Sequence, residues 1–318
     1  MNDHSSFRDA VLAREGVYLI GVAGDSGSGK TSFTKSIRQL FGTELVSTIT
    51  LDDYHLYDRE QRKALDITPL ASEANNIAGL EKDLAALKEG NSIEKMVYNH
   101  KLGVLEGPVR FRPSKIVILE GLHTLYTGTL RRSIDFSLYV DPNNYVRKEW
   151  KLKRDMEKRG YTRHQVKEEM EKRQEDYVQY IAPQKEYADA VIHIAFSRYG
   201  RSLGWSKNIY RTTLSQIPIK DNLPVADLSL SLPVLMTLLP GQFDLEYSRE
   251  VLGGRTLSSL TFDGEFDCHF ISGLMDLISG EAGMSLCRVL GDQEMLTPPD
   301  IVRALLAWRI MQEIILAP

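Results

Sequence analysis

The stretch "GVAGDSGSGKT", residues 21–31, decides the fold that this sequence predicts. It fits the pattern G-x-x-x-x-G-K-[S/T] at Gly24, Gly29, Lys30 and Thr31. The glycines let successive backbone N–H groups face one concavity, and such a concavity binds phosphate. Lys30 adds a positive charge for the outer phosphates, and the Thr31 hydroxyl can ligate Mg²⁺. The stretch therefore predicts a loop that holds a nucleoside triphosphate with Mg²⁺, and the residues expected at this nucleotide are Gly24, Asp25, Ser26, Gly27, Ser28, Gly29, Lys30, Thr31 and Ser32.

Strands and helices are expected to alternate on both sides of this loop. The predicted strands are Val17–Ala23, Leu45–Leu51, 114–123, 134–141 and 188–196. The predicted helices are Lys30–Leu40, Ala78–Gly90, Asn143–Arg159 and Arg163–Arg173. This order is typical of an α/β fold whose mostly parallel sheet is flanked by helices, as in P-loop kinases.

The sequence changes character after Ser197. Short β-like runs with Gly and Ser follow, and a helical stretch over residues 298–315 ends the chain. We expect a P-loop kinase core over residues 1–197 and an α+β extension over residues 198–318. Because this extension carries no recognisable catalytic motif, a structural or dimer-associated role is predicted for it.

Composition excludes several classes of protein. The 318 residues are 42% hydrophobic and 26% charged, which is typical of a globular protein. The net charge of -4 argues against nucleic acid as a partner. The first ten residues lack the pattern of a signal peptide, and prolines interrupt the longest apolar run, so we expect no membrane association and a cytoplasmic location.

A kinase also needs a base for its acceptor, near the carboxyl ends of the parallel strands. The segment "LDDYHLYDR" places Asp52 and Asp53 directly after the second predicted strand, with His55 and Arg59 behind them. Glu120 ends the third predicted strand, where a carboxylate can bind Mg²⁺. Without a phosphate-binding loop nearby, such an aspartate pair would be read as turn residues.

The predicted helix over residues 143–159 is rich in cations. One side carries Arg147, Lys151, Arg154, Asp155, Lys158 and Arg159. The other side carries Val146, Trp150, Leu152 and Met156. A charged helix face is usually only solvated. Here the excess of cations in a slightly acidic chain favours a role at two phosphorylated ligands.

Several motifs together resemble the phosphoribulokinase and uridine kinase family, over about residues 15–196. The matching stretches are "GVAGDSGSGKT", "LDDYH" with Arg59, "YNH" at 98–100, "EGLH" at 120–123, "KLKRDMEKRGY" and "YIAPQKEYAD". The phosphoribulokinase side of the family fits best. This resemblance implies Mg²⁺-dependent transfer of the ATP γ-phosphoryl group to the 1-hydroxyl of ribulose 5-phosphate, and a homodimer.

The resemblance also implies roles for single residues. Asp52 takes the place of the catalytic base, with Asp53 as its neighbour, and Glu120 takes the acidic Mg²⁺ role beside Thr31. The residues placed at the sugar phosphate are Asp53, His55, Arg59, Tyr98, His100 and Arg159. The residues placed on a helix that closes over the reacting phosphates are Lys151, Arg154, Asp155 and Arg159.

The cysteines depart from the pattern of plant and cyanobacterial relatives. Those relatives carry a cysteine in the P-loop, where this chain has Ser28, and Cys268 and Cys287 are its only cysteines. We therefore expect no thiol switch at the active site. Two alternatives remain open from the sequence: a uridine or cytidine kinase, and a non-catalytic ATP-dependent regulator.

Overall fold

The computed structural model describes residues 7–200, 202–203, 206–207, 209–218, 243–282 and 295–316. The chain divides into two compact units. The P-loop unit comprises Arg14–Thr34 and Glu44–Asp189, and the C-terminal unit comprises Met1–Ala13, Lys35–Thr43 and Ala190–Pro318. The residue ranges of these units differ from those of the predicted domains 1–197 and 198–318. The predicted boundary between residues 197 and 198 remains a proposal.

Four parallel strands form the centre of the P-loop unit. They are β1 (Tyr18–Ala23), β2 (Val46–Thr50), β5 (Ile116–Gly121) and β6 (Phe136–Pro142). Their order is β2-β5-β1-β6, with Ile20 opposite Ile118 on one side and Phe136 on the other. All six residues of β1 are buried, as expected for a parallel strand covered on both faces. The predicted α/β fold with a parallel sheet is confirmed.

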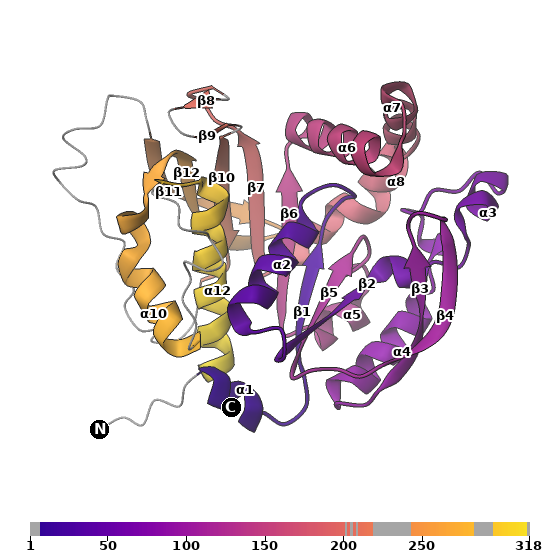
Figure 1. Ribbon diagram of the computed structural model, residues 1–318, viewed down its shortest axis with the longest axis horizontal. Coiled ribbons are helices and arrows are strands. Elements are labelled where there is room, and N and C mark those ends of the chain that lie inside the picture. Colours follow the sequence, from indigo (N-terminus) through magenta and orange to yellow (C-terminus); the bar gives the residue numbers. More distant parts are fainter. Residues whose placement is uncertain are drawn as a thin grey trace. The chain divides into compact units, whose positions relative to one another are not determined.

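Helices and short turns connect these strands (Figure 1). In chain order the P-loop unit contains η1 (Leu51–Tyr54), α3 (Arg59–Ala64), η2 (Ser72–Ala74), α4 (Ile77–Lys88), α5 (Gly128–Ser133), α6 (Asn144–Arg159), α7 (Arg163–Lys172), α8 (Gln174–Asp176), the π-helical turn η3 (Tyr177–Ile181) and η4 (Ala182–Tyr187). Helix α4 packs on the sheet through Leu80, Leu84 and Leu87, which are buried with residues of β1 and β5. Helices α6 and α7 lie beyond the carboxyl ends of β1 and β6 (Figure 1).

One hairpin of the P-loop unit does not follow from the sequence pattern. Strands β3 (Ile93–Asn99) and β4 (Val104–Phe111) pair antiparallel to each other, outside the parallel sheet. Most of their residues are partly or fully exposed. Their sequences therefore have no need of the apolar run or strict alternation of apolar and polar residues by which a buried or half-buried strand is predicted. The hairpin brings Tyr98 next to η1, and it therefore belongs to the surroundings of the site.

The C-terminal unit is built around antiparallel strands. Strands β7 (Ala190–Phe196), β10 (Tyr210–Gln216), β12 (Arg255–Gly264) and β11 (Phe243–Leu252) pair in that order. The unit also contains α1 (Phe7–Ala13), β8 (Ser202–Leu203), β9 (Ser206–Lys207), β13 (Phe266–Asp267), η5 (Cys268–Ile271), α10 (Ser272–Ala282), β14 (Met295–Leu296) and α12 (Pro298–Leu316). An α+β extension is thus confirmed.

Helix α2 (Lys30–Phe41) begins in the P-loop unit, and its residues from Lys35 onward are assigned to the C-terminal unit. Its predicted apolar positions Phe33, Ile37 and Leu40 are buried. Among the described residues, no helix combines the length and the hydrophobicity that crossing a bilayer requires.

Candidate active site

The phosphate-binding loop between β1 and α2 depends on three glycines with positive φ. These φ angles are 142° at Gly24, 82° at Gly27 and 98° at Gly29. A Cβ atom on Gly24 would lie 2.6 Å from the Val140 carbonyl oxygen, which is backbone and cannot yield. A Cβ on Gly29 would lie 3.1 Å from the Trp150 ring on α6. The glycines therefore allow both the curl of the loop and the close approach of α6.

Lys30 lies inside this loop. Its Nζ donates to the carbonyl oxygens of Gly24, at 2.9 Å, and Asp25, at 2.7 Å. Burial lowers the pKa of Lys30, while the carboxylates of Glu120 and Asp25 act in the opposite direction. A buried cation held only by carbonyl oxygens and more distant carboxylates favours an incoming anion, and the loop fits the phosphates of ATP.

Thr31 and Glu120 form a pair suited to Mg²⁺. The Thr31 hydroxyl donates to Glu120 Oε1 over 2.6 Å, and Glu120 Oε2 is buried without a hydrogen-bond partner among the described residues. A buried unpartnered carboxylate oxygen beside the phosphate loop fits a cation. Mg²⁺ in kinases commonly takes one or two protein ligands together with substrate phosphates and water. In the described ranges, no group of three or more His, Cys, Asp or Glu side chains could hold a metal ion by itself.

Asp52 lies in η1, at the carboxyl end of β2, between two imidazoles. Its carboxylate oxygens lie 3.7 Å from His55 Nε2 and 3.4 Å from His100 Nε2. Burial lowers the pKa of both histidines, which keeps the rings neutral at pH 7. Asp52 is therefore a partly exposed carboxylate without a Lys or Arg ion-pair partner among the described residues, and it can accept a proton.

Asp53 is placed quite differently from its neighbour. Its carboxylate accepts from Lys95 Nζ at 2.5 Å and from the Tyr98 backbone N–H at 2.8 Å, and its side chain is only 4% exposed. Both oxygens thus bind β3 to η1. Asp53 does not line the cavity beside Asp52. This geometry favours a supporting role over the predicted contact with the sugar phosphate, which no bound ligand tests.

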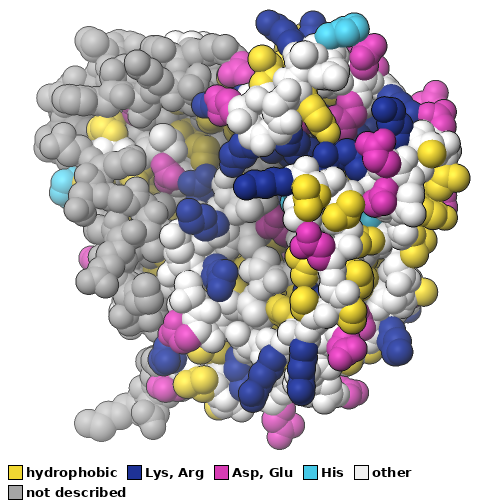
Figure 2. Space-filling view, turned by 45° about the vertical axis from the view of Figure 1, so that its right-hand side comes forward, with side chains coloured by type: hydrophobic (Ala, Val, Ile, Leu, Met, Phe, Trp, Pro, Cys, Tyr) yellow, Lys and Arg dark blue, Asp and Glu magenta, His cyan; other side chains and the backbone are white. Residues whose placement is uncertain are grey.

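A cavity of about 220 Å³, here called the acceptor cavity, opens beside Asp52. Several residues predicted for the substrate line it, namely His55, Arg59, Tyr98, His100 and Arg159. The sequence reasoning missed four further cations in its lining: Arg62, Lys63, Lys172 and Arg173. Figure 2 shows a row of Lys and Arg side chains across the upper middle of the face in view, with others scattered below it. Six cations around one small cavity favour an anionic ligand.

Interactions between neighbouring elements hold this lining in place. Arg59 Nη2 donates to the His100 carbonyl oxygen over 2.7 Å, and Arg62 Nη2 donates to the Tyr98 hydroxyl over 2.9 Å. The Tyr98 ring meets the His55 and His100 rings edge-on, with ring centres 5.1 Å apart in each case. The hairpin β3–β4 and helix α3 therefore position the acceptor cavity together.

Helix α6 buries part of its charged side, in contrast to the usual solvated face, while Lys158 on that side is exposed and Val146 on the predicted apolar side is buried. Lys151 and Asp155 are buried, whereas Met156 on the predicted apolar side is exposed. Asp155, which is 0% exposed, contacts Lys151 Nζ at 2.9 Å, Arg154 Nε at 2.8 Å and Arg159 Nη1 at 3.3 Å. Arg154 also donates to the Ser26 hydroxyl in the phosphate loop over 3.1 Å. This cluster therefore connects the loop to the rim of the acceptor cavity.

The electrostatics of this cluster keep Asp155 ionised. Burial by itself would raise the pKa of Asp155, but hydrogen bonds from Arg154 and Lys151 and the charges of both cations lower it to about 2. Burial lowers the pKa of Lys151, which Asp155 and Glu169 oppose. Asp155 does not line the acceptor cavity, so it could act on bound phosphates only through the cations that it contacts.

His123, three residues after Glu120 in the chain, allows burial near the site to be tested by pH. It is 2% exposed, meets Tyr126 edge-on, and burial, with a smaller effect of His55, lowers its pKa to about 4. The unfolded chain binds a proton at His123 below about pH 6.5, whereas the folded chain does so only below about 4. Stability is therefore lost as the pH falls from 6.5 towards 4.

We expect His123 to contribute about 2 kcal/mol to the decrease in unfolding free energy between pH 7 and pH 5. Urea unfolding of the wild type and His123→Gln at both pH values measures this as a difference in pH dependence. His164→Gln serves as the control, because the His164 side chain is 81% exposed. An unchanged pH dependence in His123→Gln would contradict the burial of a neutral ring.

The chain is similar to known proteins over more than half of its length. Residues 19–197 match the model of the Phosphoribulokinase / Uridine kinase family. A phosphoribulokinase of Synechocystis sp. is 44% identical over 182 residues, which cover 57% of this chain and 55% of that protein. A uridine kinase of Borrelia duttonii is 34% identical over 182 residues, which cover 55% of this chain and 86% of that protein.

The solved structure of a phosphoribulokinase from Rhodobacter spheroides shares the fold, with a TM-score of 0.53 and 17% identity over 93% of this chain and 100% of that one. The chain spans about half the length of the curated phosphoribulokinases that it matches.

Proposed function

The chain belongs to the phosphoribulokinase / uridine kinase family, and we propose that it transfers the γ-phosphoryl group of ATP to the 1-hydroxyl of ribulose 5-phosphate. The observation that carries this proposal is the acceptor cavity, in which six cations surround the space beside Asp52. An acceptor that already carries a phosphate needs such a second anion site, and a neutral nucleoside does not. The relatives named phosphoribulokinase, at 44% and 39% identity, support the same substrate.

The chain's own residues divide the chemistry among them. Asp52 takes the proton of the attacking hydroxyl, because its carboxylate is accessible and has no Lys or Arg partner in the described part of the chain. Lys30 and Arg154 stabilise the negative charge on the transferred group. Thr31 and Glu120 would hold Mg²⁺, which neutralises charge on the ATP phosphates when it is bound.

An acceptor panel tests this proposal. The purified protein with ATP and Mg²⁺ is offered ribulose 5-phosphate, ribose 5-phosphate, uridine, cytidine and pantothenate, and ADP release is followed together with the phosphorylated product. We expect ribulose 5-phosphate to give the highest kcat/KM. Faster consumption of uridine would support the alternative of a nucleoside kinase. The similarity to the Borrelia uridine kinase is the reason for testing this alternative. ATP binding without any phosphorylated product would support a non-catalytic regulator.

Arg59 tests the binding part of the proposal separately from the chemistry. We expect Arg59→Ala to raise KM for ribulose 5-phosphate about tenfold or more, since a hydrogen bond to a charged group contributes about 1.5–3 kcal/mol. The change in kcat should be small, because the phosphate contact is the same in the ground and transition states. Arg110→Ala is the control: Arg110 is an exposed cation of the P-loop unit outside the acceptor cavity. Equal kinetics for the two variants would remove Arg59 from the substrate site.

We also propose that the protein forms a homodimer through its C-terminal unit. Strand β11 pairs only with β12 in the described part of the chain, and it exposes Leu245, Tyr247 and Val251. An edge strand with exposed apolar side chains is suited to pairing with a second copy. Light scattering on the full chain measures the mass, and a monomer at micromolar concentration would contradict the proposal.

Catalysis should not depend on a disulfide at the phosphate loop, where Ser28 is buried. Cys268 lies in η5 of the C-terminal unit, 3.7 Å from His269 Nδ1, and Cys287 lies outside the described residues. The absence of a thiol switch at the active site therefore stays part of the proposed function.

A further inference from the structure

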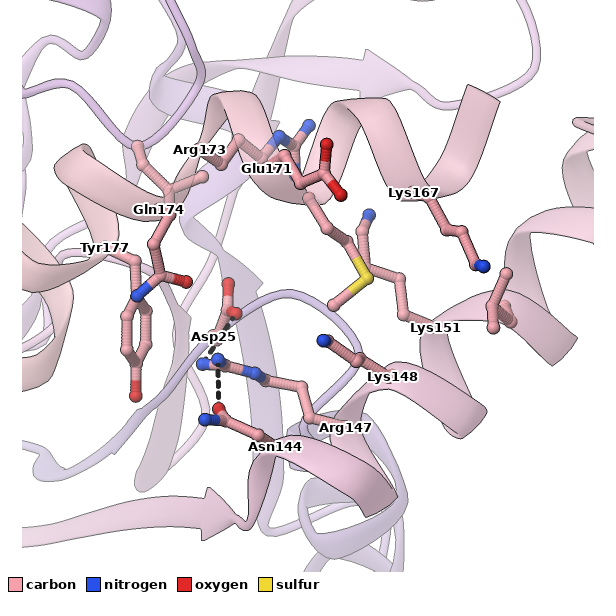
Figure 3. A pocket seen from close by; sticks show the side chains of 13 residues that line it. Asp25, Asn144, Arg147, Lys148, Lys151, Lys167, Glu171, Arg173, Gln174 and Tyr177 are labelled. Carbon is pink, nitrogen blue, oxygen red and sulfur yellow. Dashed lines mark hydrogen bonds and ion pairs between the residues drawn. The ribbon is translucent and has the colours of Figure 1, made fainter. Parts of the chain in front are cut away.

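Two cavities reach the phosphate loop. The larger one, of about 560 Å³, is lined by Asp25 and by Lys151 of α6 (Figure 3). The proposed function already places these residues at ATP and at the reacting phosphates, so it accounts for this cavity. The acceptor cavity is lined by His55, whose ring is buried. Which ring nitrogen of His55 carries a hydrogen decides which group of the substrate the ring can bind.

The side-chain amide of Asn75 fixes the position of this hydrogen. Asn75 Nδ2 donates to the carbonyl oxygens of Pro69, at 3.1 Å, and Ala71, at 2.8 Å. Carbonyl oxygens only accept hydrogen bonds, so the amide must turn its nitrogen toward them and its oxygen toward the ring. That oxygen lies 2.8 Å from His55 Nδ1. An amide oxygen also only accepts, and Nδ1 therefore carries the hydrogen.

The backbone holds Asn75 and His55 beside each other. The two residues form an antiparallel β-bridge. The residue after each of them donates its backbone N–H to the carbonyl oxygen of the residue before the other, over 2.9 and 2.7 Å. Both residues are only 7% exposed. Asn75 does not line the acceptor cavity, whereas His55 and Pro69 do, so Asn75 can act on a substrate through these two neighbours.

The second ring nitrogen of His55 is left as a hydrogen-bond acceptor. Burial lowers the pKa of His55, so the ring is neutral at pH 7 and carries one hydrogen only. With that hydrogen on Nδ1, Nε2 presents a lone pair. Asp52 Oδ1 lies 3.7 Å from Nε2, which exceeds the length of a hydrogen bond. Two acceptors thus border this part of the cavity, and hydroxyl groups suit them, because unprotonated phosphate oxygens have no hydrogen to donate.

We propose that Asn75 is a positioning residue of the acceptor site, which keeps the His55 hydrogen on Nδ1 so that Nε2 accepts a hydrogen bond from a sugar hydroxyl. This hydroxyl lies beside the group that Asp52 deprotonates, and the cations of the cavity are left to bind the phosphate. The hydroxyl part rests on the proposed function, whereas the position of the hydrogen does not. Without Asn75 the hydrogen would move to Nε2, where the Asp52 carboxylate attracts it, and the ring would bind the base instead of the substrate.

NMR of the substrate-free full chain, isotopically labelled at its histidine nitrogens, measures the position of the hydrogen. A protonated and an unprotonated ring nitrogen differ in chemical shift, and His55→Gln identifies the His55 signals by their loss. We expect the wild type to carry the hydrogen on Nδ1 and Asn75→Ala to carry it on Nε2. A wild-type ring with its hydrogen on Nε2 would overturn the proposal, as would an Asn75→Ala ring that keeps it on Nδ1. The wild type alone gives the first result, so this test does not depend on the folding of a variant.

Kinetics connect the position of the hydrogen to the reaction. We expect Asn75→Ala to lower kcat/KM for ribulose 5-phosphate about tenfold, because the ring then donates to Asp52 and no longer accepts from the substrate. KM for ATP should not change. The matched control is Asn76→Ala, which removes the neighbouring amide. That amide caps α4 by accepting from the Gly79 N–H and lines neither cavity, so the control should keep the wild-type kcat/KM.

The effect of Asn75→Ala should largely disappear in a His55→Ala background, because a residue that acts through His55 has nothing to position once the ring is gone. Additive effects of the two substitutions on kcat/KM, or equal effects of Asn75→Ala and Asn76→Ala, would show a structural role and overturn the proposal. A wild type that prefers uridine would contradict the proposed function alone, and the NMR result would still support the role of Asn75.

Discussion

Asp52→Asn should lower kcat about 10²–10⁴-fold, because positioned proton transfer contributes that much and Glu169, the other carboxylate of the acceptor cavity, is paired with Arg173. The amide keeps the shape of the side chain but cannot accept the proton of the attacking hydroxyl. KM for both substrates should change far less than kcat. Steady-state kinetics with ribulose 5-phosphate and ATP give both parameters.

Asp53→Asn is the matched comparison, since it makes the same chemical change one residue away. Asp53 is buried against Lys95, and removing one partner of a buried pair commonly costs about 3–5 kcal/mol of stability. We expect a large decrease in unfolding free energy and a smaller loss of kcat in the protein that remains folded. A larger loss of kcat at Asp53 than at Asp52 would show that the base is the other carboxylate.

The sequence predicted those strands and helices in which the pattern of apolar residues along the chain matches the residues that are buried in the fold. The run before Gly24 is apolar throughout, and β1 is buried throughout. The helix predicted over Asn143–Arg159 is α6 (Asn144–Arg159), which begins at an Asn143 cap and ends at a left-handed Gly160. An apolar run and a helix cap each depend on residues close together in the chain, so they can be recognised without knowledge of the tertiary structure.

The hairpin β3–β4 and the orientation of α6 could not be predicted in the same way. The sequence pattern put Met156 on the apolar side, yet Met156 is exposed and Asp155 is buried. The reason is a tertiary one: Asp155 is surrounded by Lys151, Arg154 and Arg159, so its burial is compensated by ion pairs that no periodicity reports.

The acceptor cavity shows the same limit. Asp52, His55 and Arg59 lie within eight residues and could be grouped from the sequence, whereas Arg173, which directly follows α7, lines the cavity from a distant part of the chain. Its ion-pair partner Glu169 lies on α7, whose sequence pattern is that of a solvated, charged helix. That Arg173 and Glu169 line the acceptor cavity follows only from tertiary packing, including that of α7 against α6.

Asp155→Asn should decrease both activity and stability by large amounts. The carboxylate is fully buried and contacts Lys151, Arg154 and Arg159, so its removal leaves three cations without their shared counter-charge. Breaking a buried ion pair in this way commonly costs about 3–5 kcal/mol. Because the cations would no longer be held toward the phosphates, we also expect kcat to fall about 10²–10³-fold, the loss typical of one charge-stabilising group.

Glu168→Gln on α7 removes the same charge at an exposed position, so it should leave kcat and unfolding free energy nearly unchanged. The pH dependence separates the electrostatic role of Asp155 from a merely steric one. Since the pKa of Asp155 is about 2 in the folded chain and about 3.8 otherwise, its contribution is complete above pH 3.8 and is lost as the pH falls toward 2. Urea unfolding of the wild type should therefore show a decrease over this window that Asp155→Asn lacks. A variant with wild-type kcat, or with the same acid dependence as the wild type, would contradict the role of Asp155 as the counter-charge that holds the phosphate-binding cations in place.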